Sequence, residues 1–177
     1  MKKIFILLIM LVLVVGYPQS IVFASDAEYT TRVRKEVQQV KQTNNGQQVF
    51  SAVNKYSTKY GVSPELIHAI IYIESKYNHK AVSKHNAQGL MQLTPATFKA
   101  RGGKNPYSID ENIHYGTKHI AGMLAKYRGN EVYALASYNG GGARVDRSIK
   151  QNKPLPKELS NYVKKVQKHK YIIKREI

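Results

Sequence analysis

Apolar residues recur at helical spacing along much of the chain, and this spacing predicts a mainly α-helical protein. Residues 47–60 carry one such stripe, formed by Val49, Phe50, Val53 and Tyr56. Gly61 follows directly and is expected to end this helix, because glycine is the residue most common just past a helix C-terminus.

A second and more apolar helix is predicted to begin after Ser63, which suits the N-cap position, with Pro64 in the first turn. Its buried face is expected to consist of Leu66, Ile67, Ile70, Ile71 and Ile73. Glu74 continues this face in the last turn, seven residues after Ile67. A carboxyl group on a core-facing surface loses hydration, which raises its pKa toward the range of a general acid.

Three further helices are predicted over residues 94–100, 108–128 and 130–139, and a last one begins after Pro156. Thr94, Ser108 and Asn130 are suitable N-caps. Ser108 and Glu111 also match the capping-box pattern.

No strand pattern of any length is present, and residues 76–88 are expected to form a loop. No heptad repeat persists, so the predicted fold is a compact orthogonal helical bundle rather than a coiled coil.

The chain is expected to comprise three parts. Residues 1–24 resemble a signal peptide, with Lys2 and Lys3 before the apolar run 4–15 and small residues that favour cleavage after Ala24. An uncleaved N-terminal membrane anchor is the alternative. Residues 25–46 are polar and are expected to form a flexible lead-in or tether, and residues 47–177 a single domain.

The net charge of +17 predicts attraction to polyanions. With a secretory signal, the expected partners are anionic polymers of the cell envelope, and nucleic acid is not expected because no motif for it is present. The six histidines show no metal-ligand spacing, so neither a metal nor a cofactor is expected. The chain has no cysteine and therefore no disulfide framework. We expect a secreted monomer located at the cell envelope.

Three short segments surround Glu74 in a pattern that resembles a known family. They are Glu74-Ser75, Ala81-Val82-Ser83 and Gly89-Leu90-Met91-Gln92. This combination resembles the catalytic core of the soluble lytic transglycosylases, the SLT or goose-lysozyme-like family. The resemblance extends over residues 49–166 and includes Ser137-Tyr138-Asn139-Gly140-Gly141, similar to the family's Ala-Tyr-Asn-Ala-Gly element. It implies a lysozyme-like helical domain with a substrate cleft.

The resemblance implies a cleavage reaction at the bond between N-acetylmuramic acid (MurNAc) and N-acetylglucosamine (GlcNAc) in peptidoglycan. Glu74 would protonate the glycosidic oxygen and then accept the proton of the muramoyl 6-hydroxyl, which leaves a 1,6-anhydro end. Glycosidases usually use two carboxylates. None of the other 10 acidic residues is an evident partner for Glu74, since the chain has 11 in all, and a single-acid mechanism fits this shortage.

The residues that resemble substrate-binding positions of the family are Ser75, Ser83, Gln92, Tyr138, Asn139 and Tyr162. Each also has an ordinary structural interpretation: serines in turns, a polar residue before a helix, a helix-terminal asparagine or a core tyrosine. The chain departs from the family pattern at Gly142, where the family has proline, and at Leu159 and Ser160, where it has Thr-Arg.

Two other functions remain open at this point. A hydrolytic muramidase on the same fold would produce free reducing ends, and a non-catalytic basic wall-binding module would produce none. Small single-domain members of the family often accompany conjugation or secretion machineries, and the resemblance implies such an apparatus as a further partner.

Overall fold

The computed structural model describes the backbone of residues 19–177 and the side chains of residues 26–177. Most of the expected signal peptide, residues 1–24, lies outside the described residues. The described helices are α1 (Gln19–Lys41), α2 (Asn44–Tyr60), α3 (Pro64–Ser75), α4 (Pro95–Ala100), α5 (Ile109–Lys126), α6 (Glu131–Gly140), α7 (Gly142–Lys150) and α8 (Lys157–Ile173). The described part contains isolated β-bridges at Gln88 but no strand. The mainly helical prediction is confirmed.

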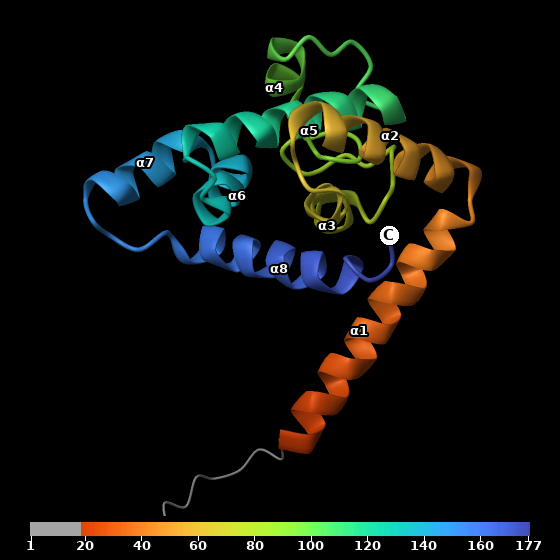
Figure 1. Cartoon of the computed structure of the whole chain (residues 1–177). Helices are drawn as coiled ribbons and strands as arrows, with labels where there is room; N and C mark the ends of the chain where they lie inside the picture. Colours follow the sequence, from red (N-terminus) through yellow and green to blue (C-terminus); the bar gives the residue numbers. More distant parts are fainter. Residues whose placement is uncertain (1–18) are drawn as a thin grey trace, which may run out of the picture.

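The helix α3 lies at the centre of the domain. Eight of its 12 residues are buried, including Leu66, Ile67, Ile70 and Ile71. In Figure 1 it is seen almost end-on between α2 and α8, the two helices that contact it, and both run across it. Packing on all sides explains why α3 is apolar around most of its circumference.

Helix starts follow the predicted signals, with two differences in detail. Ser108 Oγ accepts a hydrogen bond from the backbone N–H of Glu111 at 3.3 Å, as a cap should. The Glu111 carboxylate instead accepts from the backbone N–H groups of Lys104 at 2.8 Å and Asn105 at 3.1 Å. Ser63 has the extended backbone of an N-cap but makes no capping side-chain bond.

The segment expected to be a flexible tether differs most from the prediction, because it forms the packed helix α1. Val33 and Val37 are fully buried against the domain core. Tyr29 Oη lies 2.7 Å from His169 Nε2 in α8, and Tyr72 Oη of α3 donates to Glu36 Oε2 at 2.6 Å. Two valines in a polar segment form too short an apolar stripe to identify a buried face from sequence.

The break between α1 and α2 is short. Helix α1 ends at Lys41, and Asn44-Asn45-Gly46 form the first turn of α2. Thr43 is the N-cap, since its Oγ1 accepts from the backbone N–H of Gly46 at 2.9 Å.

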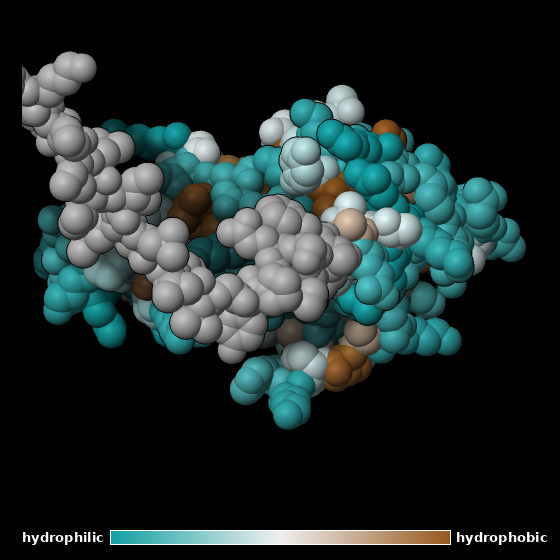
Figure 2. All heavy atoms as spheres, turned by 90° about the horizontal axis from the view of Figure 1, so that it is seen from below, coloured by the Kyte–Doolittle hydropathy of each residue, from teal (hydrophilic) through white to brown (hydrophobic). Residues whose placement is uncertain are grey.

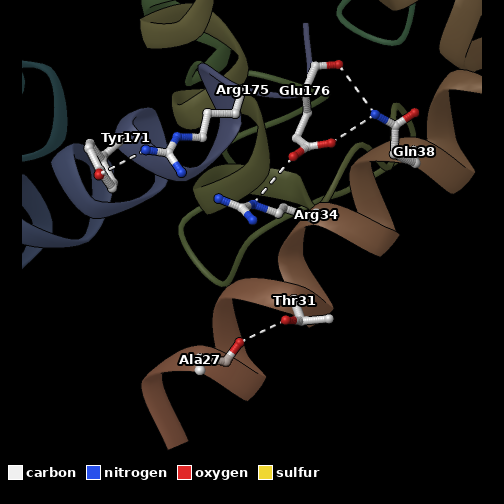
Figure 3. A network of polar contacts seen from close by, with 7 residues as sticks. All are labelled: Ala27, Thr31, Arg34, Gln38, Tyr171, Arg175 and Glu176. Atoms are coloured by element: carbon white, nitrogen blue, oxygen red, sulfur yellow. Dashed lines mark hydrogen bonds and ion pairs between the residues drawn. The ribbon is translucent and has the colours of Figure 1, made fainter. Parts of the chain in front are cut away.

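The C-terminal end of the chain is held against α1. His169, Ile172 and Ile173 at the end of α8 are buried. Beyond them the Glu176 carboxylate lies 3.3 Å from Arg34 Nε and accepts from Gln38 Nε2 at 2.9 Å (Figure 3). We call Arg34, Gln38 and Glu176 the terminal clasp.

A helix that the sequence did not indicate begins at the last of the three glycines after Asn139. The short helix α7 begins at Gly142, immediately after Gly141, whose φ is 82°. Positive φ there costs little because the residue is glycine.

The surface of the described residues is mostly polar. Figure 2 shows hydrophilic residues over most of the face viewed from below, with a few separate hydrophobic spots outside the grey atoms. Among the described helices, none combines the length and apolar character needed to span a bilayer.

Candidate active site

Glu74 lies in the last turn of α3, where this helix packs against α8. Tyr162 on α8 donates a hydrogen bond from Oη to Glu74 Oε1 at 2.6 Å. Directly after Ser75 the chain turns sharply, because Lys76 and Tyr77 both have left-handed backbone conformations, with φ of 52° and 63°. Two such non-glycine residues in succession are uncommon. They persist because Tyr77 packs against the core.

The environment of Glu74 favours its protonated form. Burial raises the pKa of the Glu74 carboxyl to about 7, even though the hydrogen bond from Tyr162 acts in the opposite direction. A carboxylic acid with this pKa is protonated in about half of the molecules at neutral pH. Such a group both donates and accepts a proton readily under physiological conditions.

A cleft of about 300 Å³ opens beside Glu74. It is lined by Glu74, Ser83, His85, Ala87, Gln92, Leu93, Thr94, Thr97, His119, Tyr138 and Asn139. Glu74 is the only acidic residue in this lining. Larger hollows lie elsewhere, for example one of about 610 Å³ beside Lys55 and Asp110, but Glu74 does not border them.

The structure brings most of the predicted site residues together. Ser83, Gln92, Tyr138 and Asn139 line the same cleft as Glu74. Tyr162 contacts Glu74 from α8.

Ser75 is the exception among the predicted residues. Its side chain is buried, and its Oγ donates to the backbone carbonyl of Ile71 at 3.1 Å. The hydroxyl therefore satisfies a bond within α3, and Ser75 does not line the cleft. This corresponds to the structural interpretation rather than the substrate-binding one.

Ser83 shapes the loop that forms one wall of the cleft. Its Oγ accepts from the backbone N–H groups of His85 at 3.2 Å and Ala87 at 3.0 Å, as in a serine-stabilised turn.

Gln92 belongs to the same wall and has part of its amide committed to the loop. Its Nε2 donates to the carbonyls of Ala81 at 3.0 Å and Gly89 at 2.9 Å. Its Oε1 has no partner among the described residues, so Gln92 offers the cleft an acceptor.

Tyr138 on α6 joins the loop to the acid. Its Oη donates to the Met91 carbonyl at 2.6 Å. Burial, reinforced by the nearby Glu74 charge, raises the pKa of Tyr138 well above 10, so the phenol stays neutral. Asn139, the next residue, has an exposed side chain that forms no hydrogen bond within the described chain.

A buried asparagine on α5 fixes the Gly-Leu-Met-Gln loop. Asn112 Oδ1 accepts from the Met91 N–H at 2.7 Å, and its Nδ2 donates to the carbonyls of Pro106 at 2.8 Å and Gln88 at 3.1 Å. Gly89 approaches so closely that an added Cβ would lie 2.2 Å from the Asn112 amide nitrogen, and its φ is 76°. Only glycine fits there.

The sequence interpretation missed His119, which lies in the cleft wall. Arg101 Nη2 lies 3.0 Å from His119 Nδ1, and the imidazole ring packs against Tyr138 with centroids 5.2 Å apart. Burial, together with the Arg101 charge, lowers the pKa of His119 to about 4. A signal was present, because Asn112, Gly116 and His119 are spaced to share one face of α5.

Within the described part of the chain, no group of three or more metal-ligating side chains lies close enough to hold an ion. The candidates for the chemistry of the site are the side chains that line the cleft. Together they define a helical domain with an open cleft that contains one carboxylic acid, Glu74, whose pKa is about 7.

Comparison with known proteins identifies the family. The family described as "Transglycosylase SLT domain" matches residues 51–161, and the chain belongs to this family. The matched range includes α3, the loop of residues 76–94 and α4 to α7. Helix α1 and the C-terminal part of α8 lie outside it.

Two curated relatives illustrate the sequence similarity. The transglycosylase of Enterobacteria phage PRD1 is 32% identical over 114 residues, which cover 64% of this chain and 43% of the phage protein. Membrane-bound lytic murein transglycosylase E of Buchnera aphidicola is 34% identical over 133 residues, covering 65% of this chain and 63% of that protein. The chain thus spans less than two thirds of either relative.

Solved structures show the same fold. The lytic transglycosylase Slt of Pseudomonas aeruginosa, solved as an inactive mutant with glutamine in place of a glutamate, aligns with a TM-score of 0.64 at 26% identity. The match covers 71% of this chain and 24% of that one. The 70 kDa soluble lytic transglycosylase of Escherichia coli aligns with a TM-score of 0.67 at 22% identity, covering 84% and 29%. The lysozyme-like helical fold is therefore confirmed.

Proposed function

We propose that this protein is a peptidoglycan lytic transglycosylase that cleaves the MurNAc–GlcNAc bond with Glu74 as its single general acid and base. One observation carries the proposal: Glu74 is the sole acid in the cleft lining, and its pKa is about 7. Membership of the SLT family and the names of the relatives support the reaction class. The Pseudomonas glutamine mutant, described as inactive, supports the choice of a glutamate.

The hydrogen bond from Tyr162 assigns separate roles to the two Glu74 oxygens. Oε1 accepts the phenol hydrogen at 2.6 Å, so Oε2 carries the transferable proton. In the first step this proton passes to the glycosidic oxygen as the bond from C1 breaks. The neighbouring acetamido group of the substrate stabilises the positive charge at C1, which a second carboxylate would otherwise do.

The second step restores the acid. The Glu74 carboxylate accepts the proton of the muramoyl 6-hydroxyl while O6 forms a bond to C1, and the product is a 1,6-anhydromuramoyl end. Glu74 regains the proton that it gave in the first step, and the new C1–O6 bond replaces the glycosidic bond. The reaction therefore consumes neither water nor a cofactor. Ser83, Gln92, Tyr138 and Asn139 would form the walls that hold the glycan in this cleft.

The remaining assignments belong to the same proposal. We assign the protein to the cell envelope as a secreted monomer, with glycan strands as its substrate. Anionic envelope polymers would attract it through its charge of +17. We also propose that it opens the wall locally for a larger conjugation or secretion apparatus.

The test is digestion of purified peptidoglycan by the protein and by Glu74→Gln, with products identified by mass spectrometry. We expect anhydro-muropeptides from the parent and a loss of at least about 100-fold in the variant. Glu65→Gln is the matched control, because the same substitution lies in the first turn of the same helix and outside the cleft lining. Products with free reducing ends would instead identify a hydrolytic muramidase, and no products from the parent would favour a binding module.

A further inference from the structure

Arg101 determines which nitrogen of His119 carries the proton. A guanidinium group can only donate hydrogen bonds. His119 Nδ1, 3.0 Å from Arg101 Nη2, must therefore be the acceptor and carry no hydrogen. The remaining proton of the neutral ring lies on Nε2, and His119 becomes a group that can only donate through this atom.

The donor atom is available to a ligand. His119 lines the cleft, and Nε2 has no hydrogen-bond partner within the described chain. It is also not among the buried polar atoms that lack partners, so it retains access to solvent. Tyr138 packs against the ring at 5.2 Å and Arg101 fixes its edge, which leaves the imidazole little freedom to rotate.

Its place relative to the acid indicates which sugar it reaches. Tyr138 contacts His119 on one side and lies near enough to Glu74 to sense its charge. All three side chains line the same cleft, and Tyr138 connects His119 with the acid. The acetamido group of the reacting MurNAc is needed at C1, so an acetamido group bound by His119 belongs to a neighbouring sugar, GlcNAc.

We infer that His119 Nε2–H is a donor subsite for the acetamido carbonyl oxygen of the GlcNAc residue next to the reacting sugar. The inference rests on the proposed function and specifies the feature of the substrate that this part of the cleft recognises. A sugar hydroxyl both donates and accepts, whereas an amide carbonyl only accepts, and a neutral imidazole held as a donor matches the latter. Gln92 Oε1 supplies an acceptor in the same cleft for the amide N–H.

Binding measurements in a Glu74→Gln background test the inference apart from catalysis. The ligands are peptide-free glycan strands, either fully N-acetylated or with the GlcNAc residues alone de-N-acetylated. With His119 intact, we expect the acetylated strand to bind about tenfold more tightly, as for loss of one buried hydrogen bond. His119→Phe should remove this preference, whereas His119→Gln, which keeps an amide donor near the position of Nε2, should restore most of it.

The tautomer provides a readout that a purely structural role would not change. Nitrogen NMR of histidine-labelled protein at pH 7 should show His119 protonated at Nε2 and not at Nδ1. Arg101→Leu should produce a mixture of tautomers, and Arg101→Lys should keep the parent tautomer. Lys99→Leu, two residues earlier in α4, should have no effect.

Each possible failure has its own signature. Equal binding of both strands by the parent background, equal preference in His119→Phe, or a proton on Nδ1 would overturn this inference. So would a His119 effect that appears only when stem peptides are present. None of these outcomes bears on turnover by the parent protein, which tests the proposed function alone.

Discussion

Tyr162 and Glu74 are 88 positions apart in sequence, and their side chains meet in a hydrogen bond of 2.6 Å between Oη and Oε1. The bond exists because α3 and α8 pack against each other, so the position of the acid depends on a helix from the end of the chain. It also acts on the acid electrostatically, because a donor to a carboxylate stabilises its charged form.

Removing this bond should change the pH dependence of activity. In Tyr162→Phe the charged form of Glu74 loses a donor, so the pKa of Glu74 rises above its present value of about 7. The first step needs protonated Glu74, and the alkaline limb of the kcat profile should therefore move upward by about one pH unit. Tyr171→Phe, at an exposed position, is the control. An unchanged limb would contradict the assigned role of Tyr162.

The raised pKa of Glu74 also predicts a pH-dependent stability. Between about 4.5, the ordinary value, and about 7, the folded protein binds more protons at this group than the unfolded chain. The free energy of unfolding therefore falls as pH rises through this window, and the contribution is fully present only below about 4.5. Urea unfolding of Glu74→Gln should show a gain over the parent that grows by roughly 3 kcal/mol between pH 4 and pH 8. A constant difference would mean that Glu74 titrates normally.

Asn112 should be important for stability without touching substrate. Asn112→Ala leaves the buried Met91 N–H without its acceptor and removes a donor from two carbonyls. We expect a loss of about 2–4 kcal/mol in the free energy of unfolding, measured by chemical denaturation. Asn105→Ala, at an exposed site seven residues earlier, should cost much less. Equal losses in the two variants would show that the Asn112 bonds do not hold the loop.

Two substitutions on opposite faces of α1 test whether this helix is part of the folded domain. Val37 is fully buried, and Val37→Ala should lower the free energy of unfolding by about 1–3 kcal/mol. Lys35 is exposed on the same helix, and Lys35→Ala should change it by less than about 0.5 kcal/mol. If both variants unfold like the parent, residues 25–46 behave as the tether that the sequence suggested.

Local pattern was sufficient to predict the central helices and the acid. The stripe from Leu66 to Glu74 is dense enough to identify a buried helix, and the N-cap residues mark most helix starts. It failed for α1. Among the described side chains of this helix only Val33 and Val37 are fully buried, and distant partners such as Tyr72 and His169 determine the packing. These contacts join residues 36 and 140 positions apart, and the local spacing of apolar residues carries no information about them.

The same distinction applies to the site. The loop and helix segments near Glu74 were identified by motif, and the structure places all but Ser75 at or beside the cleft. His119 was missed because its neighbour Arg101 comes from another element, and the tautomer follows from that contact alone.

The helix α1 has a geometric consequence for how the cleft meets its substrate. Its 23 residues span roughly 35 Å, and buried valines and the terminal clasp fix its second half to the domain. In Figure 1 its first half projects beyond the other helices. If the protein were attached to a surface through its N-terminal residues, the projecting half of α1 would act as a helical spacer between that surface and the domain. The length of this helix and its fixed angle to the domain would then determine how far the cleft lies from the surface and in which direction it faces.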